Sequence, residues 1–448
     1  MIMTLLVLLS ILFLSIETQK YLKIPSPITL ISLSYGFYYT FPDMVLFSEE
    51  TFAELVLFLI PILIASDALQ LKLEDLKKNA LSLLYLALVS VAISVVVGIV
   101  TAQLFFGDYQ LETGAIIALF AMVLATDPVS VVAVFSSFKV PHRLAILAEG
   151  ESLFNDATAL IIFTFIALPM MNGIEIGAMD IAIVSFKVIL FSILIGLVVG
   201  YLGVILMRLT QDPMSELVLI LLTAYGAFEV AEHFHMAGLL AVIVGIITLN
   251  TITQKSFDKT EKRIKKARNI VNRTSRSKKV FSTGFISGIT RKLSTDVSSV
   301  ERHKQNLNYV AVLALLANTF LFMSMASIVH IDLLLKYQRE ILMMFLITTM
   351  IRAFMMGTFA WISNKSDAMT DVGFRWWSVL LFAGIKGGLS IVMLQMLPHD
   401  FAYREMFEAI VIGVILLSTF VYALILVGII VFNKKAFAHE VDQEHHRA

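Results

Sequence analysis

Thirteen long apolar segments restrict the fold of this chain more than any other feature of its sequence. They are 17–28 residues long, and an α-helix needs about 20 residues to cross the hydrocarbon core of a bilayer. Hydrophobic residues make up 58% of the chain and charged residues only 15%, a balance that is atypical of water-soluble domains. The segments run over residues 1–17, 24–41, 51–70, 79–104, 113–137, 145–169, 180–207, 214–231, 236–252, 308–331, 339–362, 376–397 and 406–432. We therefore predict an all-α, multi-pass membrane protein with about thirteen transmembrane helices.

The basic residues predict how the chain is oriented. Lys and Arg number 28 in one set of alternate connections and 3 in the other, and the more basic connections of membrane proteins stay in the cytoplasm. With an odd number of spans, we expect the N-terminus outside the cell membrane and the C-terminus in the cytoplasm. The connection 255–304 holds 15 Lys and Arg against 4 acids. We interpret it either as a solvated linker or as a segment that contacts anionic lipids.

The fifth span contains a predicted helix break. Thr126 and Asp127 directly precede Pro128, and proline removes a backbone donor and disfavours helical geometry at the residue before it. Broken backbone at membrane depth is tolerated where it lines a cavity or is buried in protein. Transporters use the ends of such half-helices to hold small ions.

The sixth span carries four polar side chains, those of Glu151, Ser152, Asn155 and Asp156. At about 100° per residue they lie within an arc of about 140° on one face of a helix. We expect them to converge on the break in the fifth span. Their oxygen atoms are hard ligands that suit Na⁺, Li⁺, K⁺ or H⁺, and a purely structural polar network is the alternative.

Glycines predict a second break, in the twelfth span. Gly384, Gly387 and Gly388 surround Lys386, and each glycine weakens a helix interior by about 1 kcal/mol. Because the two breaks are an odd number of spans apart, the broken helices run in opposite directions, as in an inverted-topology repeat. If these helices cross, Asp127 offsets the helix ends that carry partial positive charge, and Lys386 offsets those that carry partial negative charge.

The two motifs together resemble a known family. Ala-Thr-Asp-Pro-Val in the fifth span, followed by Glu-Gly-Glu-Ser-Leu-Phe-Asn-Asp-Ala in the sixth, is similar to the monovalent cation:proton antiporters, in their NhaP-type sodium/proton exchanger branch. Residues 351–353 and 380–398 are also similar to the family, so the resemblance covers most of spans three to thirteen.

The resemblance implies a fold, a mechanism and a set of site residues. The fold would be a homodimer with a static dimerisation domain and a six-helix core that moves like an elevator. The family's cation-binding acid falls on Asp156, where Na⁺ would bind, and its structural acid falls on Glu151. The helper positions fall on Thr126, Asp127, Ser152 and Asn155. The Asn-Asp pair implies electroneutral, one-for-one exchange.

The chain departs from the family pattern in three places. Lys386 stands where the family usually has Arg. In the third span, Ser66 occupies the position of a family acid, and Asp67 is displaced from it by one residue; both are candidates for a third-span contribution to the site. The connection 255–304 is longer than the family's.

We predict that the protein is a secondary antiporter in which Na⁺ (or Li⁺) and H⁺ compete for Asp156. We further predict that Glu151, Lys386 and Arg352 form a structural charge network. K⁺/H⁺ exchange is an alternative, and a proton channel or a non-transporting ion sensor is an alternative from another class. The chain has no cysteine, and it shows no catalytic triad, phosphate loop or nucleic-acid motif. We therefore expect no enzyme activity, no cofactor and no nucleic-acid partner.

The predicted organisation follows from these assignments. We expect spans one to three (1–78) and the helices in 170–254 and 308–338 on the dimerisation side. We expect all spans to lie in the lipid bilayer. The two halves of the transport core are 79–169 and 339–432, the basic loop is 255–307, and the cytoplasmic tail is 433–448.

Overall fold

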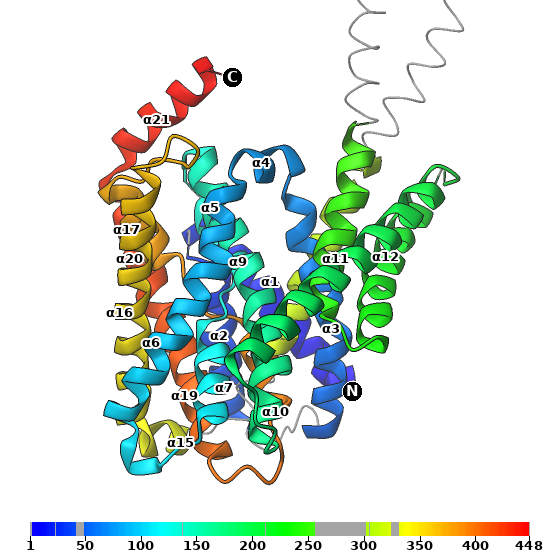
Figure 1. Ribbon diagram of the computed structural model, residues 1–448. Coiled ribbons are helices and arrows are strands. Elements are labelled where there is room, and N and C mark those ends of the chain that lie inside the picture. The colour runs from blue at the N-terminus through cyan, green and yellow to red at the C-terminus, as the bar shows by residue number, and fades with distance from the viewer. Residues whose placement is uncertain are drawn as a thin grey trace, which may run out of the picture. The chain divides into compact units, whose positions relative to one another are not determined.

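A computed structural model of the chain describes residues 2–22, 24–41, 49–136, 138–210, 212–255, 302–303, 305–323 and 331–447. The described residues form helices and contain no strand (Figure 1). Almost all of the basic connection lies outside the described residues, so its predicted contact with anionic lipids remains a prediction.

The helices follow the predicted spans. The first are α1 (Ile2–Leu22), α2 (Ser26–Thr40), α3 (Glu49–Gln70), α4 (Leu73–Lys78), α5 (Ala80–Leu84), α6 (Ser90–Phe105), the short 3-10 helix η2 (Gly107–Tyr109), α7 (Thr113–Leu124) and α8 (Pro128–Ser136). Next come α9 (His142–Ile162), α10 (Leu168–Met171), α11 (Ala178–Met207), α12 (Pro213–His233) and the helices Gly238–Lys255 and Gln305–Met323. The last are α15 (Ile331–Lys336), α16 (Gln338–Ser363), α17 (Phe374–Phe382), α18 (Gly388–Gln395), α19 (Arg404–Leu417), α20 (Ala423–Phe432) and α21 (Lys434–Arg447).

Nine helices among the described residues are long and apolar enough to cross a membrane. The multi-pass, all-helical prediction is therefore confirmed for the part of the chain that the structure describes. The count of thirteen stays a prediction. One physical reason is that the fifth and twelfth spans are each divided into two helices, and none of the four pieces reaches the length of a full crossing.

The chain divides into two compact units. Unit 1 comprises Met1–Leu63, Glu74–Leu190 and Leu315–Ala448, and unit 2 comprises Ile64–Leu73 and Phe191–Ala314. Unit 1 contains all the residues predicted for the cation site and for the charge network. The two third-span candidates belong to unit 2. The predicted division into transport and dimerisation parts remains a prediction.

Helix α7 lies inside unit 1. Every residue from Gly114 to Leu124 is buried, as expected for a helix that is apolar all round. It packs against α6, α9, α18 and α19 (Figure 1). The end of α7, where the predicted break begins, is therefore enclosed by protein.

Three π-helical turns interrupt long helices in the part of unit 1 that the structure describes. They are η1 (Tyr85–Val89), which leads into α6, η3 (Phe163–Ala167), which follows α9, and η4 (Ser418–Tyr422), which joins α19 to α20. Such turns occur frequently at functional sites, because they change which residues face a neighbouring helix.

The C-terminal helix α21 holds the start of α9. Its Glu444 carboxylate accepts the backbone N–H of His142 at 2.8 Å, while Phe437 is fully buried. Pro141, at the N-cap position of α9, makes no side-chain cap. Glu444 therefore satisfies a backbone donor that α9 itself leaves open.

Candidate functional site

The break predicted in the fifth span is present. Helix α7 ends at Leu124 and α8 begins at Pro128, so the three residues between them are not helical. Pro128 occupies the first helical position of α8, where its missing N–H costs nothing. Thr126 is 2% exposed and Asp127 is 8% exposed, so the polar backbone of the break is enclosed by protein.

The side chain of Asp156, on α9, contacts the backbone of this break. The N–H of Thr126 donates to Oδ1 of Asp156 at 2.7 Å. This donor is available because the chain has left helical geometry at that residue. Asp156 is 4% exposed. A buried carboxylate thus lies at the interrupted end of a helix, as the sequence predicts.

Ser152 and Asn155, also on α9, contact the same break. The hydroxyl of Ser152 donates to Oγ1 of Thr126 at 2.8 Å. The Nδ2 of Asn155 donates to Thr126 Oγ1 at 3.1 Å and to the carbonyl of Leu124 at 2.9 Å. Both donors are buried. These bonds hold the Asn155 side chain by its amide nitrogen and do not involve its Oδ1, the atom able to bind a cation.

Asp127 joins the first break to the second. Its carboxylate accepts the N–H and the hydroxyl of Ser130 in the first turn of α8, where a negative charge stabilises a helix N-terminus. Its own N–H donates to the carbonyl of Ile385 at 2.7 Å. Ile385 lies in the break predicted in the twelfth span, which is present between Phe382, the last residue of α17, and Gly388, the first of α18.

Lys386 lies in the second break and reaches the first. Its Nζ donates to the carbonyl of Leu124, the last residue of α7, at 3.2 Å. The last carbonyls of a helix have no partner inside the helix and carry partial negative charge. Lys386, 3% exposed, therefore supplies a positive charge at the C-terminal end of α7.

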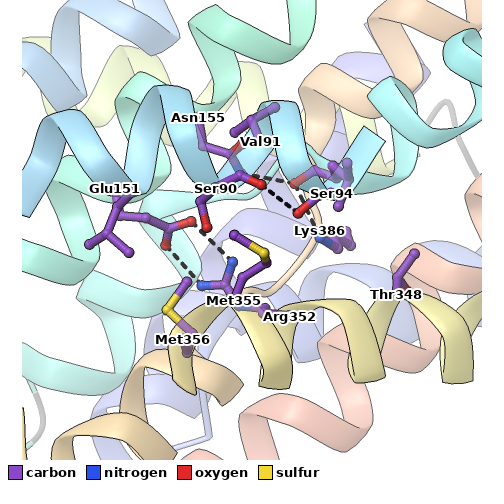
Figure 2. A pocket seen from close by; sticks show the side chains of 12 residues that line it. Ser90, Val91, Ser94, Glu151, Asn155, Thr348, Arg352, Met355, Met356 and Lys386 are labelled. Atoms are coloured by element: carbon purple, nitrogen blue, oxygen red, sulfur yellow. Dashed lines mark hydrogen bonds and ion pairs between the residues drawn. The ribbon is translucent and has the colours of Figure 1, made fainter. Parts of the chain in front are cut away.

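Glu151 pairs with Arg352, another member of the predicted charge network. Its carboxylate accepts two bonds from Arg352 of α16, at 3.0 and 2.8 Å (Figure 2). The planar guanidinium makes a bidentate pair that an ammonium cannot make. Its other bonds, to the carbonyls of Leu380 and Leu381, tie the pair to the end of α17.

A small polar cavity adjoins these charges. It measures about 20 Å³ and is lined by residues from α6, α9, α16 and the second break, among them Ser90, Ser94, Asn155, Thr348 and Lys386 (Figure 2). Oδ1 of Asn155 is buried and has no hydrogen-bond partner among the described residues. The volume and the polar lining suit a single water molecule.

The two predicted third-span residues belong to unit 2. Ser66 and Asp67 are buried in α3, in the part that belongs to unit 2, and the bonds described above involve unit 1 alone. Their contribution to the site stays a prediction. Within the described residues, no group of three or more His, Asp or Glu side chains is arranged to hold a metal ion.

Some contributors were not found from the sequence. The carbonyls of Leu124 and Ile385 belong to the backbone, so residue type does not indicate them. Ser130 follows Asp127 by three residues at a helix start, a spacing typical of helix capping, and could have been recognised. Ser418 of η4 accepts the N–H of Lys386 at 3.1 Å, and no local pattern distinguishes it from other helix serines.

Replacing Gly387 by Ala tests the contact between the two breaks. A Cβ at Gly387 would overlap the Cβ of Asp127 and lie 2.9 Å from its Cγ. These atoms are next to the backbone, so the breaks must separate. We expect Gly387→Ala to lower stability by about 1–3 kcal/mol, measured as a lower midpoint of thermal unfolding in detergent.

Gly36→Ala, in α2, is the matched control, because a Cβ at Gly36 meets nothing within 4 Å and alanine favours the helix. Its midpoint should be equal to that of the wild type or higher. Equal midpoints for the two variants would contradict a tight contact between the breaks.

The fold and the site together define a class of protein. A buried carboxylate at paired helix breaks inside a multi-pass helical protein is the architecture of secondary transporters. Residues 5–274 match the family described as "Sodium/hydrogen exchanger, transmembrane". The chain belongs to this family, which confirms the resemblance found in its sequence.

Individual relatives agree with this assignment. The Na⁺/H⁺ antiporter NhaH of Halobacillus dabanensis is 27% identical, over 85% of this chain and 83% of that protein. The Na⁺/H⁺ antiporter ApNhaP of Aphanothece halophytica is also 27% identical, over 90% of this chain and 68% of that protein. The fold is similar to a solved structure of the sodium proton antiporter MjNhaP1 from Methanocaldococcus jannaschii. Its TM-score is 0.66 at 15% identity, over 98% of this chain and 99% of that one.

Proposed function

We propose that this protein is a secondary antiporter that exchanges Na⁺ or Li⁺ for H⁺ across the cytoplasmic membrane, with no enzymatic reaction and no cofactor. The observation that carries the proposal is the buried carboxylate of Asp156, bonded to the backbone of an interrupted helix. The names of the relatives, all Na⁺/H⁺ antiporters, support it.

Competition for one carboxylate is sufficient for exchange. An ionised carboxylate is penalised in surroundings of low dielectric constant, and binding of either H⁺ or Na⁺ relieves that penalty. Asp156 therefore binds one cation at a time, and the empty, charged site crosses the membrane slowly. Oxygen atoms of the neighbouring side chains are ligands that suit an alkali cation. They belong to Thr126, Asp127, Ser152 and Asn155.

The charges around the site support one-for-one exchange. Glu151 is neutralised by Arg352 through a bidentate pair, so it is occupied as a structural acid. Lys386 is directed to the end of α7. The carboxylate of Asp127 caps the start of α8. This leaves Asp156 as the carboxylate that exchanges one Na⁺ for one H⁺. The three residues Glu151, Arg352 and Lys386 serve as the charge network that joins α9, α16 and the second break.

Lys386→Arg is expected to retain most of the cation-dependent proton movement. Arginine keeps the positive charge at the carbonyl of Leu124, and the adjoining cavity of about 20 Å³ accommodates part of the larger head group. Lys386→Met removes a charged donor from a buried carbonyl, and we expect the rate to fall about tenfold or more. Both variants are measured in proteoliposomes. A methionine variant as active as the wild type would argue against a role for the charge.

The larger-scale features of the proposal follow the resemblance to the family. We propose a homodimer, two broken helices that cross, and a six-helix core that moves like an elevator between the two sides. The bond between Asp127 and Ile385 supports the crossing, because it joins the two breaks directly. The N-terminus would lie outside and the C-terminus in the cytoplasm.

Proton movement in proteoliposomes tests the proposed function. Purified protein is reconstituted with a pH-sensitive dye inside, a pH gradient is imposed, and Na⁺, Li⁺, K⁺ or choline is added outside. We expect Na⁺ and Li⁺ to dissipate the gradient and choline to have no effect. Dissipation by K⁺ instead would favour K⁺/H⁺ exchange. Collapse of the gradient without any alkali cation would indicate a proton channel, and no response at all would indicate a sensor.

A further inference from the structure

One peptide group holds the two breaks together. The carbonyl of Ile385 and the N–H of Lys386 belong to the same planar peptide unit, in which they point in opposite directions. The carbonyl accepts the N–H of Asp127 at 2.7 Å. The N–H donates to Oγ of Ser418 at 3.1 Å. The unit is therefore held from both sides, by the first break and by η4.

Ser418 is oriented to act as the acceptor in this bond. Its own hydroxyl donates to the carbonyl of Ile415, in the same helix, at 3.0 Å, so a lone pair of Oγ is left for Lys386. Ser418 is 0% exposed and Lys386 is 3% exposed. A buried backbone N–H that loses its acceptor cannot find water as a substitute.

The same turn contacts the surroundings of the break at a second point. Tyr422 follows Ser418 by four residues, so the two share one face of the helix. Its ring packs edge-on against Phe382, the last residue of α17, with centroids 5.5 Å apart. Its hydroxyl bonds Thr349 of α16 at 2.6 Å. Helix α16 also carries Arg352, so η4 contacts both the end of α17 and the helix that pairs with Glu151.

A short series of bonds leads from Ser418 to the carboxylate of the cation site. The peptide unit held by Ser418 bonds the N–H of Asp127, and the neighbouring N–H of Thr126 bonds Asp156. The orientation of this peptide unit therefore sets the position of the backbone that meets Asp156. It also sets the direction in which the Lys386 side chain leaves the break.

We propose that Ser418 is a positioning residue for the cation site, whose hydroxyl holds the second break against the first. This inference rests on the proposed function of Asp156, and it concerns a residue that acts on the site through the backbone of the two breaks. Without the hydroxyl, the peptide unit can rotate, and the contact with Asp127 is weakened. The site then binds Na⁺ less tightly.

The test compares three variants of the full-length protein in proteoliposomes. Ser418→Ala removes the acceptor, and Ser418→Thr keeps the hydroxyl. Ser363→Ala is the matched control, because Ser363 is equally buried and its hydroxyl bonds the Ala360 carbonyl of its own helix. We expect Ser418→Ala to raise the Na⁺ concentration for half-maximal rate about tenfold with little change in maximal rate. Ser418→Thr and Ser363→Ala should remain close to the wild type.

Hydrogen–deuterium exchange gives a second reading that does not depend on transport. Peptides covering 383–388 should exchange faster in Ser418→Ala than in the wild type or Ser363→Ala. The inference would be overturned if Ser418→Ala left both the Na⁺ concentration for half-maximal rate and the hydrogen–deuterium exchange of these peptides unchanged. A fall in maximal rate alone would also overturn it, because that outcome indicates a merely structural role.

The failure of this inference can be distinguished from the failure of the proposed function. If the wild type shows no cation-dependent proton movement, the proposed function is wrong. In that case the hydrogen–deuterium exchange of peptides covering 383–388 still decides whether Ser418 holds the break. If Ser418→Thr does not fold, the comparison of the two alanine variants decides on its own.

Discussion

Asp156→Asn is expected to reduce Na⁺-driven proton movement to the level of protein-free liposomes, while the protein still folds. Asparagine has nearly the shape of aspartate, and its Oδ1 can still accept the N–H of Thr126 that lies 2.7 Å from the carboxylate. It has no charge, however, and at neutral pH it binds neither H⁺ nor Na⁺ as a carboxylate does. The fluorescence assay in proteoliposomes measures this loss directly.

A binding measurement separates lost transport from lost binding. A cation that binds the folded protein raises its unfolding temperature, by an amount equivalent to about 2.7 kcal/mol at a hundred times the dissociation constant. Na⁺ should stabilise the wild type and should leave Asp156→Asn unaffected. Asp400→Asn, an exposed replacement of the same kind, should behave like the wild type in both assays. Substantial Na⁺-driven proton movement by Asp156→Asn would contradict the assignment of the cation site.

Arg352→Met is expected to produce the largest loss of stability. The Arg352–Glu151 pair is bidentate at 3.0 and 2.8 Å, and its side chains are 8% and 3% exposed. Removing one partner leaves a buried carboxylate without its counter-charge, which costs about 3–5 kcal/mol. The midpoint of thermal unfolding in detergent should fall accordingly.

A double variant shows whether the loss comes from the pair. Glu151→Gln with Arg352→Met removes both charges, so it should be more stable than Arg352→Met alone, and the difference measures the coupling. Lys336→Met is the control, because the Lys336–Glu405 pair is well exposed. Exposed ion pairs contribute little to the stability of a folded protein. The midpoint of Lys336→Met should not change. Additive effects of the two buried replacements would contradict the pairing.

Much of the fold was predictable because its causes are local. Apolar length predicts the helices, and the two breaks lie where Pro128 and the glycines around Lys386 predict them. The approach of Asp156 to the first break was also predictable. It requires only that neighbouring spans pack together and that a polar face of α9 meets a polar break.

The choice among charged partners was not predictable in the same way. Lys386 and Arg352 are both bases inside spans, and each lies more than two hundred residues from Glu151 in the sequence. Helical periodicity orients a side chain around its own axis but does not indicate which distant helix it meets. For this reason the sequence did not indicate which base pairs with Glu151, and the bond between Ser418 and the second break was missed.

The amino-acid sequence by itself determined the class of protein, the interrupted helices and the buried acid that meets the first break. Apolar length, proline and glycine act through the chain's immediate neighbourhood, so their effects do not depend on long-range contacts. Only the tertiary structure decided that Arg352 pairs with Glu151, that Lys386 meets the end of α7, and that Ser418 accepts the N–H of Lys386. These pairings depend on the packing of helices that are far apart in the chain, and the geometry of that packing selects one partner among several of similar chemistry.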